Sequence, residues 1–134
     1  MKTIYSTKVT SHGGRDGTVR SSDGLLDLQV TSPKGGQQEG TNPEQLFAAG
    51  YAACFHSALK MTAKNKSIDA DQSEVTAEVA LLEKDGFQLS VKLIIRIPGA
   101  SQAEAKEIAQ LAHDTCPYSK AIKNNIEVDL QVAG

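Results

Sequence analysis

One stretch, residues 41–66 (TNPEQLFAAGYAACFHSALKMTAKNK), carries the longest helical pattern of this 134-residue chain. It is rich in alanine and leucine, which are good helix formers. Thr41 or Asn42 can cap its start, and Pro43 fits the first helical position. Glu44, three residues after Thr41, would complete a capping box. Apolar and small residues at spacings of three and four predict one buried stripe: Leu46, Phe47, Gly50, Tyr51, Cys54, Ala58 and Met61.

Alternating apolar residues predict strands on both sides of this helix. The expected strands are residues 3–10, 19–21, 25–31, 74–82, 87–97 and 126–132. The glycine-rich run at 11–17 and the segments 22–24 and 84–86 predict turns, the last of them closing a long β-hairpin. The segment SPKGGQQEG predicts a surface loop before the long helix.

Two further helices are expected after the hairpin. Ser101 and Glu104 form a capping box at the start of a helix to His113, whose inner face would be Ala105, Ile108, Ala109, Leu111 and Ala112. Pro117 suits the first position of a short helix to about residue 124, with Cys116 near its cap. The order of elements predicts one α+β domain over residues 1–134, with antiparallel sheet.

Composition excludes several classes of function. The net charge of −2 offers no basic field for nucleic acid or acidic lipid, and the absence of tryptophan argues against a stacking platform for single strands. No apolar run is long enough to span a membrane, and the first residues lack a signal core. We therefore expect a cytoplasmic protein, in which two cysteines are free, redox-active or metal-bound rather than a permanent disulfide.

Cys54 and Cys116 leave three interpretations open. They are two inert core thiols, since free cysteine is often buried, or a redox pair with one attacking and one resolving thiol. A third is zinc bound by Cys54-x-His56 and His113-x-x-Cys116. Residues i and i+2 of a helix point roughly 200° apart, however, so Cys54 and His56 cannot easily hold one ion. We expect no metal.

A thiol in the middle of a helix needs a nearby cation to become a thiolate. Arg15, within the glycine-rich turn, is the candidate. By spacing alone it is a solvated loop arginine, although such turns can hold a side chain in an unusual direction. Glu44 is most simply a capping carboxylate.

Three motifs together resemble the organic hydroperoxide resistance (Ohr) family of the OsmC-like superfamily. They are GGRDG at 13–17, NPEQLFAAGYAACFHSAL at 42–59, and CPYS at 116–119 followed by Asn125 and Ile126. The resemblance implies an OsmC-like fold, with antiparallel sheets around a long central helix in an intertwined homodimer. It also implies a cytoplasmic, thiol-dependent peroxidase that reduces organic hydroperoxides.

The resemblance assigns roles residue by residue. Cys54 matches the peroxidatic cysteine and Cys116 the resolving one, which implies a Cys54–Cys116 disulfide. Arg15 matches the arginine that activates the thiolate, and Glu44 the carboxylate that holds this arginine. The family's reductant is dihydrolipoamide on lipoylated proteins, so no bound cofactor is expected.

The apolar neighbours Phe47, Tyr51 and Phe55 suit an organic, lipid-type hydroperoxide better than hydrogen peroxide, so they are candidate substrate-binding residues. Two alternatives remain: an OsmC-type peroxidase of broader specificity, and a non-catalytic redox-sensing or binding protein.

One geometric consequence concerns Glu44 and Cys54, which would lie about 15 Å apart along an unbroken helix. A single arginine cannot then join them within one chain. Either the helix breaks near Gly50, or Arg15 and Glu44 come from the second subunit of a dimer, which is our expectation.

Overall fold

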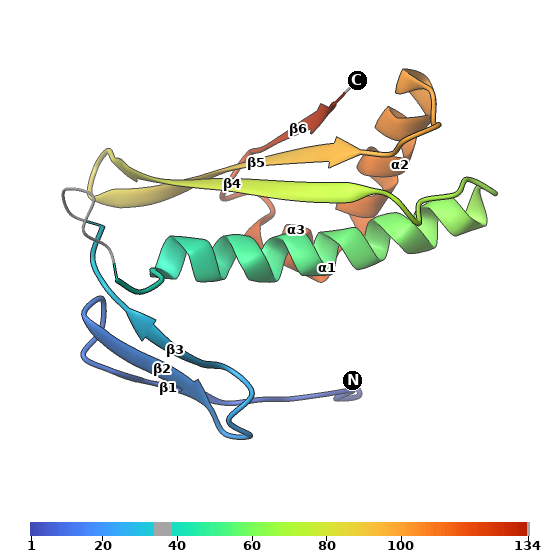
Figure 1. Ribbon diagram of the computed structural model, residues 1–134. Helices are drawn as coiled ribbons and strands as arrows, with labels where there is room; N and C mark the ends of the chain where they lie inside the picture. The colour runs from blue at the N-terminus through green and yellow to red at the C-terminus, as the bar shows by residue number, and fades with distance from the viewer. Residues whose placement is uncertain (34–38, 134) are drawn as a thin grey trace. The chain divides into compact units, whose positions relative to one another are not determined.

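The computed structural model describes residues 1–33 and 39–133, so part of the predicted loop before the long helix lies outside them. The strands are β1 (Val9–His12), β2 (Gly17–Ser21), β3 (Asp27–Val30), β4 (Glu74–Glu83), β5 (Phe87–Arg96) and β6 (Val128–Val132). The helices are α1 (Pro43–Asn65), α2 (Gln102–Thr115) and α3 (Pro117–Ile122) (Figure 1). The predicted α+β class is confirmed. The chain divides into two compact units, residues 1–46 and 47–134, with the boundary inside α1.

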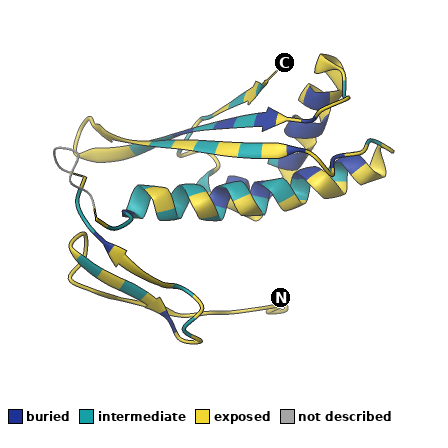
Figure 2. Ribbon diagram, viewed as in Figure 1, coloured by how far each residue is buried: buried dark blue, intermediate teal, exposed yellow. Residues whose placement is uncertain are grey.

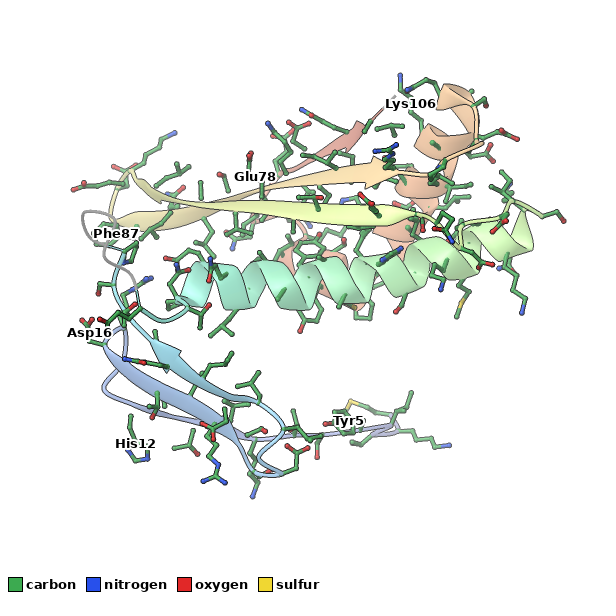
Figure 3. The ribbon with its side chains drawn as sticks, viewed as in Figure 1. Tyr5, His12, Asp16, Glu78, Phe87 and Lys106 are labelled. Carbon is green, nitrogen blue, oxygen red and sulfur yellow. The ribbon has the colours of Figure 1, made fainter. Side chains whose placement is uncertain are left out.

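The first unit contains the antiparallel sheet β1-β2-β3 and the first turn of α1. The strand predicted over residues 3–10 was wrong for most of its length, because pairing with β2 begins only where Val9 faces Ser21. The preceding residues lie outside β1, and Ile4 and Tyr5 are 92% and 76% exposed (Tyr5 is labelled in Figure 3). An alternating pattern forms a strand only where a neighbouring strand accepts its backbone hydrogen bonds.

The turn between β1 and β2 depends on glycine. Gly13 has a φ of +86°, in the region that favours glycine. At Gly17 any side chain would collide with the carbonyl oxygen of His12. The run predicted as a turn is therefore tight over residues 13–16, and it presents Arg15 at its tip.

The second unit is built on the sheet β4-β5-β6. β4 and β5 form the predicted hairpin, in register from Glu74 opposite Arg96 to Glu83 opposite Phe87. β6 pairs parallel to β5, so the expectation of a wholly antiparallel sheet was wrong. The reason is topological: α2 and α3 lie between β5 and β6, and such a crossover returns the chain in the same direction.

Within this unit, α1 packs along one face of the sheet (Figure 1). The fully buried residues of α1 are spaced by four: Tyr51, Phe55, Leu59 and Ala63 (Figure 2). They share one hydrophobic core with Val91, Leu93 and Ile95 of β5 and with Ile97, which follows β5. The stripe predicted from sequence was therefore partly wrong. Met61 is 68% exposed, because it lies outside the strip of Tyr51, Phe55, Leu59 and Ala63 that faces the core.

The helix ends also differ in part from prediction. Asn42 caps α1 by accepting a hydrogen bond from the backbone N–H of Gln45 at 2.8 Å. The predicted capping box of Thr41 and Glu44 was wrong. The Thr41 hydroxyl donates a hydrogen bond to the side chain of Gln45, and the Glu44 carboxylate accepts hydrogen bonds from Arg15.

The capping box of Ser101 and Glu104 at the start of α2 is confirmed. α3 starts at Pro117 as predicted, with Cys116 as its N-cap, but it ends at Ile122. Lys106 of α2 and Glu78 of β4 are labelled in Figure 3, and both are exposed. Within residues 1–33 and 39–133, the protein contains no helix of the length and hydropathy that a membrane span requires.

Helix α2 allows a direct test of this packing, because sequence placed both Ile108 and Leu111 on its inner face. The structure leaves Ile108 1% exposed and Leu111 36% exposed. Ile108→Ala should lower the free energy of unfolding by about 2–5 kcal/mol, and Leu111→Ala by about 1 kcal/mol or less. Urea unfolding of both variants measures this difference; equal losses would contradict the observed face of α2.

Candidate active site

Two free thiols meet inside the second unit. Cys54 comes from the middle of α1 and Cys116 from the junction of α2 and α3. The thiol of Cys116 lies 3.8 Å from the sulfur of Cys54 and donates to it. Cys116 is completely buried, whereas Cys54 is half-buried. Because a disulfide is about 2.05 Å long, an approach of under about 2 Å would join them.

The contact between α1 and α3 brings the thiols together. The ring of Tyr118 lies against Gly50, where an added Cβ would come within 3.0 Å of the Tyr118 hydroxyl oxygen. The small residue at position 50 therefore allows α3 to approach α1 closely. The rings of Tyr51 and Tyr118 also pack together, with centroids 5.9 Å apart.

Burial works against the reactive form of Cys54. It raises the pKa of this thiol, and the neighbouring Cys116 raises it further. A hydrogen bond with the backbone of Tyr118 acts in the opposite direction and lowers the pKa, but the net shift is upward. The thiol pair by itself therefore favours neutral sulfur, and thiolate chemistry requires a positive charge from outside this cluster.

The first unit holds an arginine in a fixed ion pair. Arg15 donates two hydrogen bonds to Glu44, from Nη1 to Oε1 at 2.8 Å and from Nη2 to Oε2 at 3.1 Å. This bidentate pairing fixes the plane of the guanidinium. The carboxylate also raises the pKa of Arg15, so the arginine stays charged. The Arg15 side chain remains 45% exposed while Glu44 is 17% exposed, so the cation is held and still accessible.

The same turn is anchored at a second point. Both carboxylate oxygens of Asp16 accept hydrogen bonds from Ser32, one from its backbone N–H at 3.2 Å and one from its hydroxyl at 3.1 Å. Neighbouring residues of the GGRDG motif thus connect the turn to two different segments of the first unit. Sequence analysis singled out Arg15 but not Asp16, whose contact with Ser32 is seen only in the fold.

The three aromatic candidates for substrate binding form an edge-to-face series along α1. Phe47 and Tyr51 have ring centroids 6.2 Å apart, and Tyr51 and Phe55 have centroids 6.5 Å apart. Tyr51 and Phe55 have no exposed surface, whereas Phe47 is half-buried. Of the three, Phe47 is the residue with surface available to a ligand in this chain.

The two histidines of the zinc interpretation are each bound to a serine. His56 Nε2 lies 2.9 Å from the hydroxyl of Ser73, and His113 Nδ1 lies 2.8 Å from the hydroxyl of Ser119. Among the residues that the structure describes, no three histidine, cysteine or acidic side chains gather in a way that could hold a metal ion. Sequence analysis missed Ser119; the signal was its place in the CPYS motif, one turn after Cys116.

In this α+β fold, a free thiol from α1 and a free thiol from the α2–α3 junction meet beside a closely packed aromatic cluster. Comparison with known proteins identifies the family. Residues 35–131 match the model of the OsmC-like protein family.

Among curated proteins, the organic hydroperoxide resistance protein OhrB of Bacillus subtilis is 42% identical, over 96% of this chain and 98% of its own. OhrA of the same organism is 44% identical, over 97% and 96% of the two chains. The crystal structure of Bacillus subtilis OhrB superposes with a TM-score of 0.91, covering 98% of this chain and all of that one. The chain belongs to the organic hydroperoxide resistance branch of the OsmC-like family, as the motifs predicted.

The unequal exposure of the two thiols predicts the order in which they react. A small alkylating agent, iodoacetamide, should modify Cys54 well before Cys116, because only Cys54 has accessible surface. Peptide mass spectrometry over a time course measures the order, with Cys54→Ser and Cys116→Ser as matched single-thiol proteins. Equal rates in these two variants would contradict the buried position of Cys116.

Proposed function

We propose that the protein is a thiol-dependent peroxidase that reduces organic hydroperoxides to alcohols. The observation that carries this proposal is the 3.8 Å separation of the Cys54 and Cys116 sulfur atoms, which come from helices far apart in the sequence. The names of the Ohr relatives support the substrate class, because they describe resistance to organic hydroperoxides. We also propose that this chemistry takes place in the cytoplasm.

The cycle has three balanced steps. The Cys54 thiolate attacks the peroxide, giving Cys54 sulfenic acid and an alkoxide that takes up a proton to become the alcohol. The Cys116 thiol then attacks the sulfenic sulfur, forming the disulfide and water. Finally a dithiol, such as dihydrolipoamide on a lipoylated protein, exchanges with the disulfide: both cysteine thiols are restored and the dithiol is oxidised to its own disulfide. No bound cofactor is needed in this scheme.

Arg15 and Glu44 supply the activation. Since burial raises the pKa of Cys54, a guanidinium beside the sulfur is required to favour the thiolate. Arginine suits this role because it cannot lose its own proton, and it can also stabilise the alkoxide as the O–O bond breaks. The bidentate contact with Glu44 holds the guanidinium in one orientation before substrate arrives.

We further propose that each site combines Arg15 and Glu44 of one chain with Cys54 of a second copy in a homodimer. α1 is a continuous helix from Pro43 to Asn65, so the alternative of a helix break near Gly50 is wrong. Glu44 and Cys54 are therefore separated by about 15 Å of helical rise.

The substrate would be an apolar hydroperoxide. Phe47 offers the accessible aromatic surface, while Tyr51 and Phe55 support it from within the core. A water-like substrate would gain little from such a surface, because apolar contact favours carbon-rich molecules.

Turnover with cumene hydroperoxide and dihydrolipoamide tests the proposal. Wild type should consume peroxide continuously, and Cys54→Ser should lose essentially all activity because it lacks the nucleophile. Cys116→Ser should form sulfenic acid once and then over-oxidise, detected as added oxygen by intact mass spectrometry. A wild type that oxidises once without turnover would instead indicate a redox sensor, and equal rates with hydrogen peroxide would favour a broader OsmC-type enzyme.

Mixing inactive variants tests the composite site. Co-refolded Cys54→Ser and Arg15→Ala chains should regain activity, because one site of each mixed dimer combines an intact Arg15 with an intact Cys54. Cys54→Ser mixed with Cys116→Ser is the matched control and should not regain the disulfide cycle, since both cysteines meet within one chain. Failure of the first mixture to recover would contradict the shared site.

A further inference from the structure

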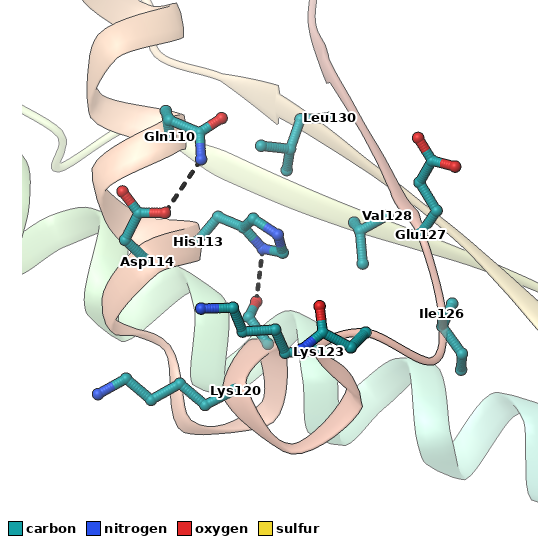
Figure 4. A pocket seen from close by; sticks show the side chains of 11 residues that line it. Gln110, His113, Asp114, Lys120, Lys123, Ile126, Glu127, Val128 and Leu130 are labelled. Atoms are coloured by element: carbon teal, nitrogen blue, oxygen red, sulfur yellow. Dashed lines mark hydrogen bonds between the residues drawn. The ribbon is translucent and has the colours of Figure 1, made fainter.

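A buried hydroxyl joins the three helices that surround the thiols. Ser119 of α3 is 3% exposed, and its oxygen lies 2.6 Å from the hydroxyl of Tyr51 on α1. The same oxygen lies 2.8 Å from Nδ1 of His113 on α2 (Figure 4). Ser119 is thus the middle member of a hydrogen-bonded chain, Tyr51–Ser119–His113, which we call the serine bridge.

Every member of the serine bridge lies one helical turn from a cysteine in the sequence. Tyr51 precedes Cys54 by three residues, and His113 and Ser119 stand three residues before and after Cys116. Both cysteines also act electrostatically on Tyr51: burial raises the pKa of this phenol, and charge on Cys116 or Cys54 raises it further. Tyr51 therefore stays protonated and remains a donor, close to both sulfur atoms.

The position of Cys116 matters for disulfide formation, because its sulfur atom must still move closer to that of Cys54. They are 3.8 Å apart, whereas a disulfide is about 2.05 Å long. The serine bridge connects α3, whose N-cap is Cys116, to the helix that carries Cys54. Losing the bridge would remove a hydrogen-bonded contact that, together with the packing of Tyr118 on Gly50, holds the start of α3 against α1.

The proton count of the serine bridge depends on the charge of His113. With a neutral ring whose Nδ1 carries no hydrogen, Ser119 donates to His113 and Tyr51 donates to Ser119, so each bond has one proton. When His113 is protonated, Nδ1 must donate to Ser119 instead. Either Ser119 or Tyr51 then holds an O–H proton that finds no acceptor within the bridge, which is costly in a buried place.

A pocket of about 710 Å³ gives solvent access to His113. Figure 4 shows the His113 ring among the lining side chains, with its Nδ1 directed to the serine. The charged groups that line this pocket with His113 are Asp114 from α2, Lys120 from α3, Lys123 at the end of α3, and Glu127 from the segment before β6. Tyr51 of α1 is linked to the ring through Ser119 of α3. Protons can therefore reach one end of a bridge whose other end is buried beside the thiols.

His56 provides an internal contrast. It also bonds to a serine, Ser73, but the hydroxyl of Ser73 donates to the carbonyl oxygen of Ala70 at 2.6 Å. The hydroxyl oxygen of Ser73 must then accept a hydrogen bond from Nε2–H of His56. This series of hydrogen bonds ends at the backbone carbonyl of Ala70. A histidine two residues from Cys54 is thus tied to a loop, with no link to the segment of Cys116.

We propose that the serine bridge positions Cys116 for disulfide closure with Cys54 and that protonation of His113 slows this closure. The inference rests on the proposed disulfide cycle. Its step is Cys54 sulfenic acid plus Cys116 thiol giving the disulfide and water: the S–OH and S–H bonds break, the S–S bond forms, and the hydroxyl leaves with the thiol proton. Ser119, Tyr51 and His113 are positioning residues in this step.

The test uses diamide, so that it does not depend on peroxidase activity. Cys54 adds to diamide, and Cys116 then displaces the hydrazine to form the disulfide; quenching with N-ethylmaleimide and intact mass spectrometry follow both steps. The proteins are wild type, Ser119→Ala, His113→Asn and, as the matched histidine control, His56→Gln. Asparagine can keep a hydrogen bond near the position of Nδ1 but does not titrate. Measurements span the range in which histidine ordinarily changes charge, about pH 5 to 8.

Closure in Ser119→Ala should be slower by about tenfold or more, with adduct formation at Cys54 unchanged, because small misplacements of reacting atoms have large effects on rate. The ratio of closure rates, wild type to His113→Asn, should fall as the pH is lowered, and His56→Gln should follow wild type. Unchanged closure in Ser119→Ala, or a constant ratio across pH, would overturn the proposal. Normal diamide results without peroxide turnover would refute only the proposed enzyme activity.

Discussion

The structure depends on the close approach of α3 to α1. Gly50 leaves room for the ring of Tyr118, and this contact brings the buried Cys116 within 3.8 Å of Cys54. The same closeness partly buries Cys54 and raises its pKa, so the packing that pairs the thiols also disfavours the thiolate. The pairing of the thiols and the activation of Cys54 are therefore separate requirements, and in our proposal residues of different units meet them.

The first unit contributes a charge rather than a thiol. Its glycine-rich turn exists because Gly13 takes a positive φ and Gly17 lies against the carbonyl of His12, where no side chain fits. The resulting loop presents Arg15 to Glu44 in a bidentate pair. An arginine fixed in this way needs no reorganisation when charge develops near it, which is the condition for electrostatic catalysis. In our proposal, this arginine lies beside Cys54 of the second chain of a dimer, so that the activating charge and the thiol pair form one site.

Sequence patterns predicted the elements best where local rules decide them. The hairpin of β4 and β5, the capping box at Ser101 and the start of α3 at Pro117 all agree with the structure. Predictions were wrong where distant partners decide: residues 3–8 lie outside β1, β6 runs parallel to β5, and Met61 and Leu111 are exposed. Glu44 shows both outcomes: local rules gave it a capping role, which was wrong, whereas the motif resemblance paired it with Arg15, and the structure contains this contact.

By itself the sequence determined the long helix that carries Cys54, the family, and the residues Arg15, Glu44 and Cys116 as candidates, because caps, periodicity and motifs are written in consecutive residues. Only the tertiary structure decided that the two sulfur atoms lie within contact distance, that burial raises the Cys54 pKa, and that Ser119 joins Tyr51 and His113. These depend on the packing of three helices against one another, and no local pattern encodes the distances between them.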